Sequence, residues 1–171
     1  MTIETFENTI LPLKHPIFRY ANFMLKNEDD AKDISQEVLI KIWQKREEVD
    51  QVLNLRAWAI TITRNKCLDL IKSRKGEVYT WDENLDTPLN ETPFDTTRIK
   101  DETNWVKDLM KELPIKQKEV FYLRHFEGNS YKEIEETLDL DENKVKVYLH
   151  RARTFIKRTM EEKHAYGLKT G

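Results

Sequence analysis

Apolar residues recur at helical spacing through the first part of this chain, and they predict a series of amphipathic helices. One stripe consists of Ala31, Ile34, Val38 and Ile42. Its spacings of three, four and four residues place these side chains on one face of a helix. Asn27 and the acids after it precede the stripe, and such residues cap a helix and complement the positive end of its dipole. An earlier helix is predicted from about Pro16, since proline is common in a first helical turn.

A third long helix is predicted from about Leu55 to Ser73, because apolar positions recur through it and bases followed by Gly76 mark its end. The helical pattern then stops. Residues 76–104 contain two prolines, many threonines and acids, and no sustained period. A stretch of this length without periodicity is too long for a loop inside a compact domain. We therefore interpret it as a flexible linker between two helical domains.

The second half of the chain has the outline of a helix-turn-helix. Pro114 separates one short helix from the next, and Gly128 marks a helix end. Ser130 and Glu133 have the spacing of a capping box, which opens a helix of about two turns. Asp141 is the expected cap of a longer last helix. The buried stripe of that helix is expected to be Val145, Leu149, Ala152 and Ile156. A short helix, a tight turn and a longer helix in this order predict a helix-turn-helix.

The fold class that these patterns predict is all-α, with two small helical domains joined by a flexible acidic linker. The expected boundaries are residues 1–75 for the first domain, 76–104 for the linker and 105–171 for the second domain with its C-terminal tail. The composition agrees, because 35% of the residues are charged and only four are glycine, which is typical of a helical protein.

Charge is unevenly distributed along the chain, although the formal net charge is only -2. Residues 56–75 carry six bases and one acid, and residues 144–158 carry six bases and no acid. Between them, residues 81–112 carry nine acids and four bases. Two basic segments separated by an acidic one predict two contact surfaces for a polyanion. The acidic segment between them is expected to be a spacer that avoids the polyanion.

The last predicted helix carries its bases on both rims of its exposed surface. Lys146, His150, Arg153 and Lys157 form one row, and Lys144, Arg151 and Arg158 form the other. Such a surface fits the major groove of a DNA duplex, where Arg and Lys contact phosphates and guanine edges. A solvated charged face and a membrane-surface helix are the alternatives. The capped helix and turn before it favour DNA, and its apolar stripe is needed for packing within the domain.

Several functional classes find no support in the sequence. No apolar run reaches the roughly 20 residues of a membrane span, and the first residues lack the pattern of a signal peptide, so a cytoplasmic protein is expected. Cys67 is the only cysteine and the four histidines are scattered, so neither a metal site nor an internal disulfide is predicted. No glycine-rich phosphate loop and no nucleophile with a base partner occur in the sequence. We expect no enzymatic activity, no cofactor and no small-molecule substrate.

Three stretches of the chain resemble bacterial sigma factors of the extracytoplasmic-function group. They are NEDDAKDISQEVLIKIW, LRAWAITITRNKCLDLIKSRK and LPIKQKEVFYLRHFEGNSYKEIEETLDLDENKVKVYLHRAR. The resemblance covers about residues 16–75 and 105–160, and it depends on the order and spacing of these stretches. It implies a dissociable subunit that binds core RNA polymerase and directs promoter recognition and transcription initiation at specific genes. An anti-sigma factor is a further partner that the resemblance implies.

The resemblance assigns a polymerase-docking surface to the helix predicted after Asn27. Its residues are Asp30, Asp33, Gln36 and Glu37, which match the family's contact with the clamp helices of the largest polymerase subunit. From the sequence alone these are polar residues near a helix start, and capping also accounts for Asp30. Asp33, Gln36 and Glu37 lie too far into the helix for capping to explain them.

The third predicted helix matches the family's surface for the -10 box and the displaced single strand. The matching residues are Arg64, Asn65, Lys66, Asp69, Lys72, Arg74 and Lys75. Positive charge holds single-stranded DNA, and an asparagine such as Asn65 reads the edge of an unstacked base. By resemblance, the loop at residues 45–54 supplies a pocket for a flipped base.

The last predicted helix matches the family's reader of the -35 box. Its expected DNA-binding residues are Lys144, Lys146, His150, Arg151 and Arg153. The chain departs from the family at Val147 and Tyr148, where a small hydroxyl residue and a base are usual, and this predicts an unusual base preference. It departs again at Glu135, where alanine is usual, so the carboxylate is expected to turn outward.

A stand-alone helix-turn-helix regulator that binds an operator as a dimer is the alternative function. A sigma factor would bind promoter DNA weakly by itself and would support transcription with core polymerase. A regulator would bind its operator tightly without polymerase. The docking-like surface between Asp33 and Glu37 favours the sigma factor.

Overall fold

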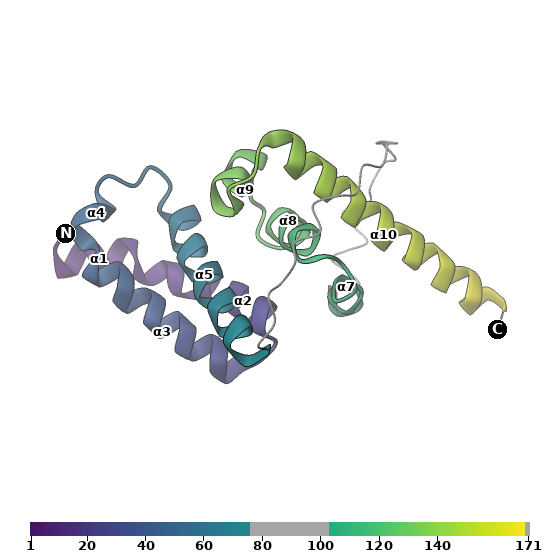
Figure 1. Cartoon of the computed structure of the whole chain (residues 1–171), viewed down its shortest axis with the longest axis horizontal. Helices are drawn as coiled ribbons and strands as arrows, with labels where there is room; N and C mark the ends of the chain where they lie inside the picture. Colours follow the sequence, from purple (N-terminus) through teal and green to yellow (C-terminus); the bar gives the residue numbers. More distant parts are fainter. Residues whose placement is uncertain (76–102, 170–171) are drawn as a thin grey trace. The chain divides into compact units, whose positions relative to one another are not determined.

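In the computed structural model of the chain, all regular secondary structure of the described residues is helical (Figure 1). It describes residues 1–75 and 103–169, of which residues 75, 103–104 and 166–169 are described by their backbone alone. No helix in these two ranges is both long enough and apolar enough to cross a membrane. The predicted linker falls almost entirely outside the described residues.

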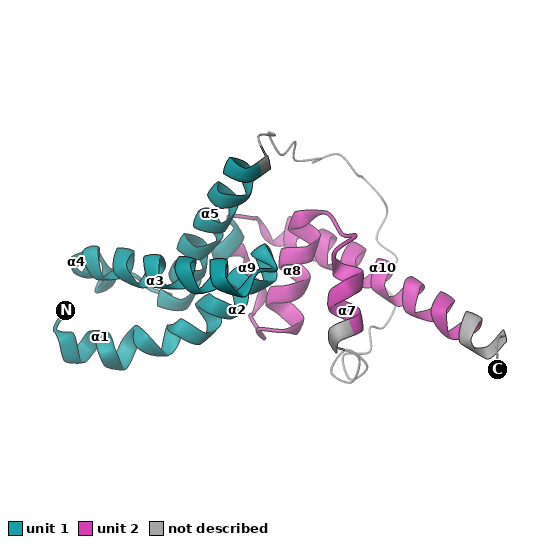
Figure 2. Cartoon of the chain, turned by 90° about the horizontal axis from the view of Figure 1, so that it is seen from below, with its two compact units in different colours: residues 1–84, 136–138 teal, residues 85–135, 139–171 magenta. Residues whose placement is uncertain are grey.

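The chain divides into two compact units (Figure 2). One consists of residues 1–84 with 136–138, and the other of residues 85–135 with 139–171. The all-α class agrees with the prediction, and the exact domain boundaries at 75 and 105 stay a prediction.

The first unit is built around α2 (Lys14–Leu25), which packs against both α3 (Glu28–Gln44) and α5 (Leu55–Lys75). The predicted stripe of α3 is buried at every position, and it shares a core with Ile17 and Ala21 of α2 and with Ala59 and Ile62 of α5. Asn27 caps α3 as predicted, since its side chain accepts a hydrogen bond from the Asp30 amide at 3.0 Å. The periodicity of the sequence therefore determines which faces of α3 and α5 remain outside.

Two short elements at the N-terminus differ from the prediction, which began the helical part near Pro16. Helix α1 (Ile3–Thr9) and the 3-10 helix η1 (Leu11–Leu13) precede α2. Thr2 caps α1 by accepting a hydrogen bond from the Thr5 amide at 3.1 Å. α1 has no buried residue, and Ile3 and Phe6 are its only apolar residues, too few to establish a helical period by themselves.

The second unit contains α7 (Thr103–Met110), α8 (Ile115–His125), the first part of α9 (Tyr131–Leu138) and the long α10 (Glu142–Lys169). The last residues of α9, 136–138, are grouped with the first unit. α10 packs against α8 and, farther along, against α7. Its predicted stripe is buried in full: Val145, Leu149, Ala152 and Ile156. Val120 and Leu123 of α8 and Ile134 of α9 are also buried, so the stripe of α10 belongs to the core of this unit and is not free for lipid.

The turn between α9 and α10 has the local geometry of a helix-turn-helix. Asp139 ends α9 in the left-handed conformation, with φ of 52°, and the Asp141 side chain accepts a hydrogen bond from the Lys144 amide at 2.8 Å. The predicted capping box at the start of α9 is confirmed, because Ser130 and Glu133 each accept a hydrogen bond from the other's amide. Gly128 is left-handed with φ of 70°, but the cap of α8 is Phe126 and not the glycine.

We expect Ser130→Ala to lower the free energy of unfolding by about 1 kcal/mol, because it removes the acceptor for the Glu133 amide. Chemical denaturation would measure the change. Thr154→Ala removes an exposed hydroxyl within α10 and serves as the control, for which little change is expected. An equal loss in both variants would contradict the role of the capping box.

Candidate nucleic-acid interface

The predicted docking residues lie along the outer face of α3, but they differ in their surroundings. Asp33 and Gln36 are exposed, and no described residue forms an ion pair with Asp33. Asp30 and Glu37 each contact a base of α5. The sequence assigned all four residues to one exposed docking surface, whereas Asp30 and Glu37 form ion pairs within the chain.

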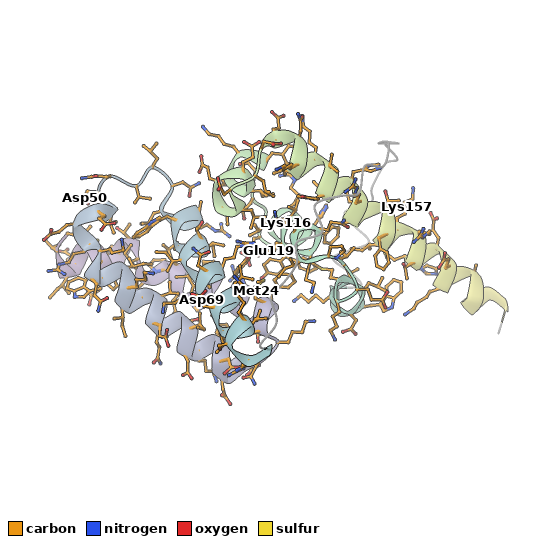
Figure 3. All side chains as sticks on the ribbon, in the orientation of Figure 1. Met24, Asp50, Asp69, Lys116, Glu119 and Lys157 are labelled. Atoms are coloured by element: carbon orange, nitrogen blue, oxygen red, sulfur yellow. The ribbon has the colours of Figure 1, made fainter. Side chains whose placement is uncertain are left out.

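The predicted single-strand surface lies on α5 of the same unit. Asn65, Asp69 and Lys72 are exposed and Arg64 is half-buried. Asp69 projects from the middle of α5 (Figure 3). The Lys75 side chain lies outside the described residues. The surface mixes one acid with several bases, so its net charge stays positive and suits a DNA backbone.

Asp30 and Arg74 form a two-pronged contact between α3 and α5. Arg74 Nη1 donates to Asp30 Oδ2 at 2.5 Å, and Nη2 donates to Oδ1 at 3.0 Å. The hydrogen bonds from Arg74 lower the pKa of the Asp30 carboxyl, and the same contact raises the pKa of Arg74. Both groups are therefore fully charged at neutral pH.

Lys66 and Glu37 form a second contact between the same helices. Lys66 Nζ donates to Glu37 Oε2 at 2.7 Å. The Lys66 side chain is 27% exposed and that of Glu37 is 55% exposed, so water reaches this pair. Such a pair contributes little to stability, but it decides where the ammonium group points.

The predicted flipped-base loop contains a short helix, α4 (Arg46–Val49). Leu53 in the same loop is fully exposed, which is unusual for a leucine. The ring of the preceding Trp43 packs edge-on against Phe6 with centroids 5.1 Å apart, and Arg46 covers that ring. Trp43 therefore belongs to the packing of the unit.

The predicted -35 residues lie on both sides of the buried stripe of α10. Lys144 and Lys146 are exposed near its start, and His150, Arg151 and Arg153 are half-buried one to three turns later. The structure thus keeps all five on one helix with graded access to solvent. Lys144 and Lys146 near the start of the helix are exposed, as groove insertion by the start of a helix requires.

Lys146 has two acidic neighbours, Glu142 on α10 and Glu135 on α9. Its ammonium lies 2.6 Å from Glu142 Oε1, one turn earlier on α10. The hydrogen bond and charge of Glu142 raise the pKa of Lys146, and the charge of Glu135 on α9 acts in the same direction. Glu135 is half-buried, and the outward turn of its carboxylate stays a prediction. The i,i+4 spacing of Glu142 and Lys146 is the signal that could have revealed this pair.

Arg153 is anchored to α8 by His125. Arg153 Nε donates to His125 Nε2 at 3.1 Å, so Nε2 is an acceptor and the ring proton sits on Nδ1. Burial, and after it the charges of Arg153 and Arg124, lower the pKa of His125 to about 4. One donor of Arg153 is thus committed to its own domain. No local pattern predicts the contact, because 28 residues separate its partners.

Acidification is expected to destabilise the second unit through His125. The unfolded ring takes up a proton near pH 6.5, whereas the folded ring resists protonation until about pH 4. The contribution of neutral His125 to the free energy of unfolding is therefore complete above about pH 6.5, and it is lost as the pH falls toward 4. We expect the free energy of unfolding to fall by about 1 kcal/mol, a value that already allows for the contact of the ring with solvent.

The measurement is chemical denaturation of the chain and of His125→Gln between neutral pH and pH 4. Glutamine keeps an acceptor for Arg153 but does not titrate. The difference in stability between the two proteins should change across this window. A constant difference would contradict the assignment.

Arg151 has an unused donor within the described part of the chain. Its Nε is buried and finds no hydrogen-bond acceptor there. A buried donor without a partner costs about 1–3 kcal/mol, and an arriving phosphate or base would give the guanidinium new acceptors. Arg151 is thus the half-buried base of α10 with the clearest capacity for a further partner.

Comparison with known proteins defines the family. The family model for sigma-70 region 2 matches residues 10–77, and the family model for sigma-70 region 4 matches residues 103–156. The RNA polymerase sigma factor SigV of Bacillus subtilis is 30% identical over 139 residues, which cover 81% of each chain. The chain belongs to the sigma-70 family of RNA polymerase sigma factors.

A further relative agrees with this membership and with the extracytoplasmic-function group, and a solved structure agrees with the fold. The ECF RNA polymerase sigma factor SigL of Mycobacterium tuberculosis is 28% identical over 148 residues, covering 85% of this chain and 83% of the relative. The sigma factor RpoE of Bartonella quintana, solved with the anti-sigma factor NepR, has a similar fold with a TM-score of 0.70. It is 23% identical and covers 93% of this chain and 98% of its own. The chain is a sigma factor that directs promoter recognition, and the stand-alone regulator is not favoured.

Proposed function

We propose that this sigma factor docks on the clamp helices of the largest subunit of core RNA polymerase through the outer face of α3. Asp33 and Gln36 are the centre of this surface, because they are exposed and lie beyond the reach of helix capping. Asp30 and Glu37 flank them on the same face. The observation that carries the proposal is that the buried stripe of α3 leaves this acidic face outside.

We propose that α5 holds the -10 box and the displaced strand. Arg64, Lys66, Lys72 and Arg74 supply the positive charge, and Asn65 is exposed for a base edge. Asp69 is an exposed acid on the same helix. The proximity of this surface to α3 within one unit supports a joint role, since strand opening occurs on the polymerase.

We propose that α10 reads the -35 box from the major groove. Lys144 and Lys146 contact the groove first, because both are exposed near the start of α10, which is the end that enters the groove. Arg151 supplies a further base or phosphate contact, and Arg153 is positioned by His125. Val147 and Tyr148 are half-buried, so their effect on base preference is limited to the partly exposed atoms.

The proposed setting is the cytoplasm, where polymerase and promoters meet, and the protein acts without catalysis of its own. An anti-sigma factor is the proposed regulator, supported by family membership and by the complex of RpoE with NepR. The acidic segment at residues 76–104 remains a proposed tether between the two domains.

Binding of promoter DNA with and without core polymerase tests the function against the alternative. We expect weak, strongly salt-dependent binding by the chain alone and specific binding by its complex with core polymerase. Tight binding without polymerase, with a footprint of two-fold symmetry, would instead favour a dimeric operator-binding regulator.

A further inference from the structure

Acids of the proposed docking surface and bases of the proposed single-strand surface contact one another within the first unit. Asp30 pairs with Arg74, which is 44 residues away, and Glu37 pairs with Lys66, which is 29 residues away. Both pairs join α3 to α5, so they follow from the packing of the two helices and not from local spacing. The two pairs thus join residues of the proposed polymerase-docking surface to residues of the proposed single-strand surface.

The two pairs differ in which partner is more shielded from water. In the first, the Asp30 side chain is 18% exposed and that of Arg74 is 57% exposed. In the second, Lys66 is the more shielded partner at 27% exposure. The fork of Arg74 engages both carboxylate oxygens of Asp30, which fixes the plane of its guanidinium. A strand arriving at α5 therefore meets two bases that already have anionic partners.

We propose that these two ion pairs mask the single-strand surface of the sigma factor while it is free, by holding Arg74 and Lys66 on the acids of α3. The inference rests on the proposed function, because it takes α5 as the strand-binding helix. A base paired with a carboxylate gains less from a phosphate, since the carboxylate must first be displaced. A partner that engages the carboxylates of α3 would release both bases together, which couples docking to strand capture.

The test compares variants of the full chain for binding to a fluorescein-labelled oligothymidylate across a range of salt concentrations. Asp30→Asn and Glu37→Gln each remove one masking charge. Asp33→Asn is the matched control, because it removes the same charge from an exposed site between them that has no ion pair among the described residues. All three keep the size of the side chain.

We expect Asp30→Asn and Glu37→Gln to bind the oligonucleotide about two- to fivefold more tightly than the unmodified chain. Each should also steepen the dependence of log affinity on log salt by about 0.7, because one more base contacts the strand. Asp33→Asn should give a smaller gain without a change of slope. Equal gains and equal slopes in all three variants would overturn the masking.

A second set of variants separates the failure of masking from the failure of the proposed surface. Arg74→Ala in the Asp30→Asn background should cancel the gain in affinity. If Arg74→Ala weakens binding but Asp30→Asn behaves like Asp33→Asn, the surface is right and the masking is wrong. If neither Arg74→Ala in the Asp30→Asn background nor Lys66→Ala in the Glu37→Gln background changes the affinity, although the bases are unmasked there, α5 is not the strand-binding helix and both proposals fall.

Discussion

Arg151→Glu is expected to weaken discrimination of the -35 box by about 2–3 kcal/mol, which is roughly a 30- to 150-fold loss in relative affinity. The reason is geometric as well as electrostatic. Arg151 is half-buried on the rim of α10, and its Nε has no acceptor within the described part of the chain. The substitution removes the donors and places a negative charge beside the base edges that Arg151 is proposed to contact, where it would repel the acceptors of guanine. Competition binding of the polymerase complex to promoter variants would measure the loss.

Two further variants make this result interpretable. Arg158→Glu is the matched control, because Arg158 lies two turns later on the same helix, is 67% exposed and already has Glu162 4.0 Å away. It should change discrimination little. Arg151→Lys keeps the charge but loses the planar fork, so it separates a base contact from a phosphate contact. Equal losses for Arg151→Glu and Arg158→Glu would show that general charge, and not a specific contact, is responsible.

Gln36→Ala is expected to weaken the association with core polymerase by about 2 kcal/mol, or roughly thirtyfold. Gln36 is exposed at the centre of the proposed docking surface, and its replacement changes neither the charge of α3 nor either ion pair with α5. Titration of core polymerase with the labelled chain would measure the affinity. Binding to the labelled oligonucleotide should be unaffected.

The matched control is Gln44→Ala, because Gln44 is an exposed glutamine at the end of the same helix. It should leave polymerase association close to that of the unmodified chain. If Gln36→Ala lowered binding to polymerase and to DNA by the same factor, the substitution would be acting on the fold, and the docking assignment would lose its support.

Helix positions and inner faces could be predicted from the sequence because they depend on local spacing. The stripes of α3 and α10 are buried at every predicted position. The caps at Asn27, Ser130 and Asp141 are present as predicted, since each involves residues only three apart. These local rules also place Asp33, Gln36 and Lys144 on the outside of their helices.

The partners of the candidate site residues could not be predicted, because they depend on how helices pack. Arg74 reaches Asp30 and Arg153 reaches His125 across long stretches of sequence. Sequence reasoning therefore overstated how freely these bases face a ligand. Glu142 is a different case, because its spacing of four residues from Lys146 predicts an ion pair on a helix. The ion pair affects the candidate site only because Lys146 belongs to the proposed DNA-binding surface of α10.

The most direct test of the central claim is transcription of a promoter library by core polymerase mixed with this protein, followed by sequencing of the transcripts. We predict transcripts that start at a defined distance from a shared pair of upstream boxes, and that are lost with Gln36→Ala and redistributed with Arg151→Lys. Transcripts that are the same with and without the protein, or that share no upstream sequence, would contradict the account.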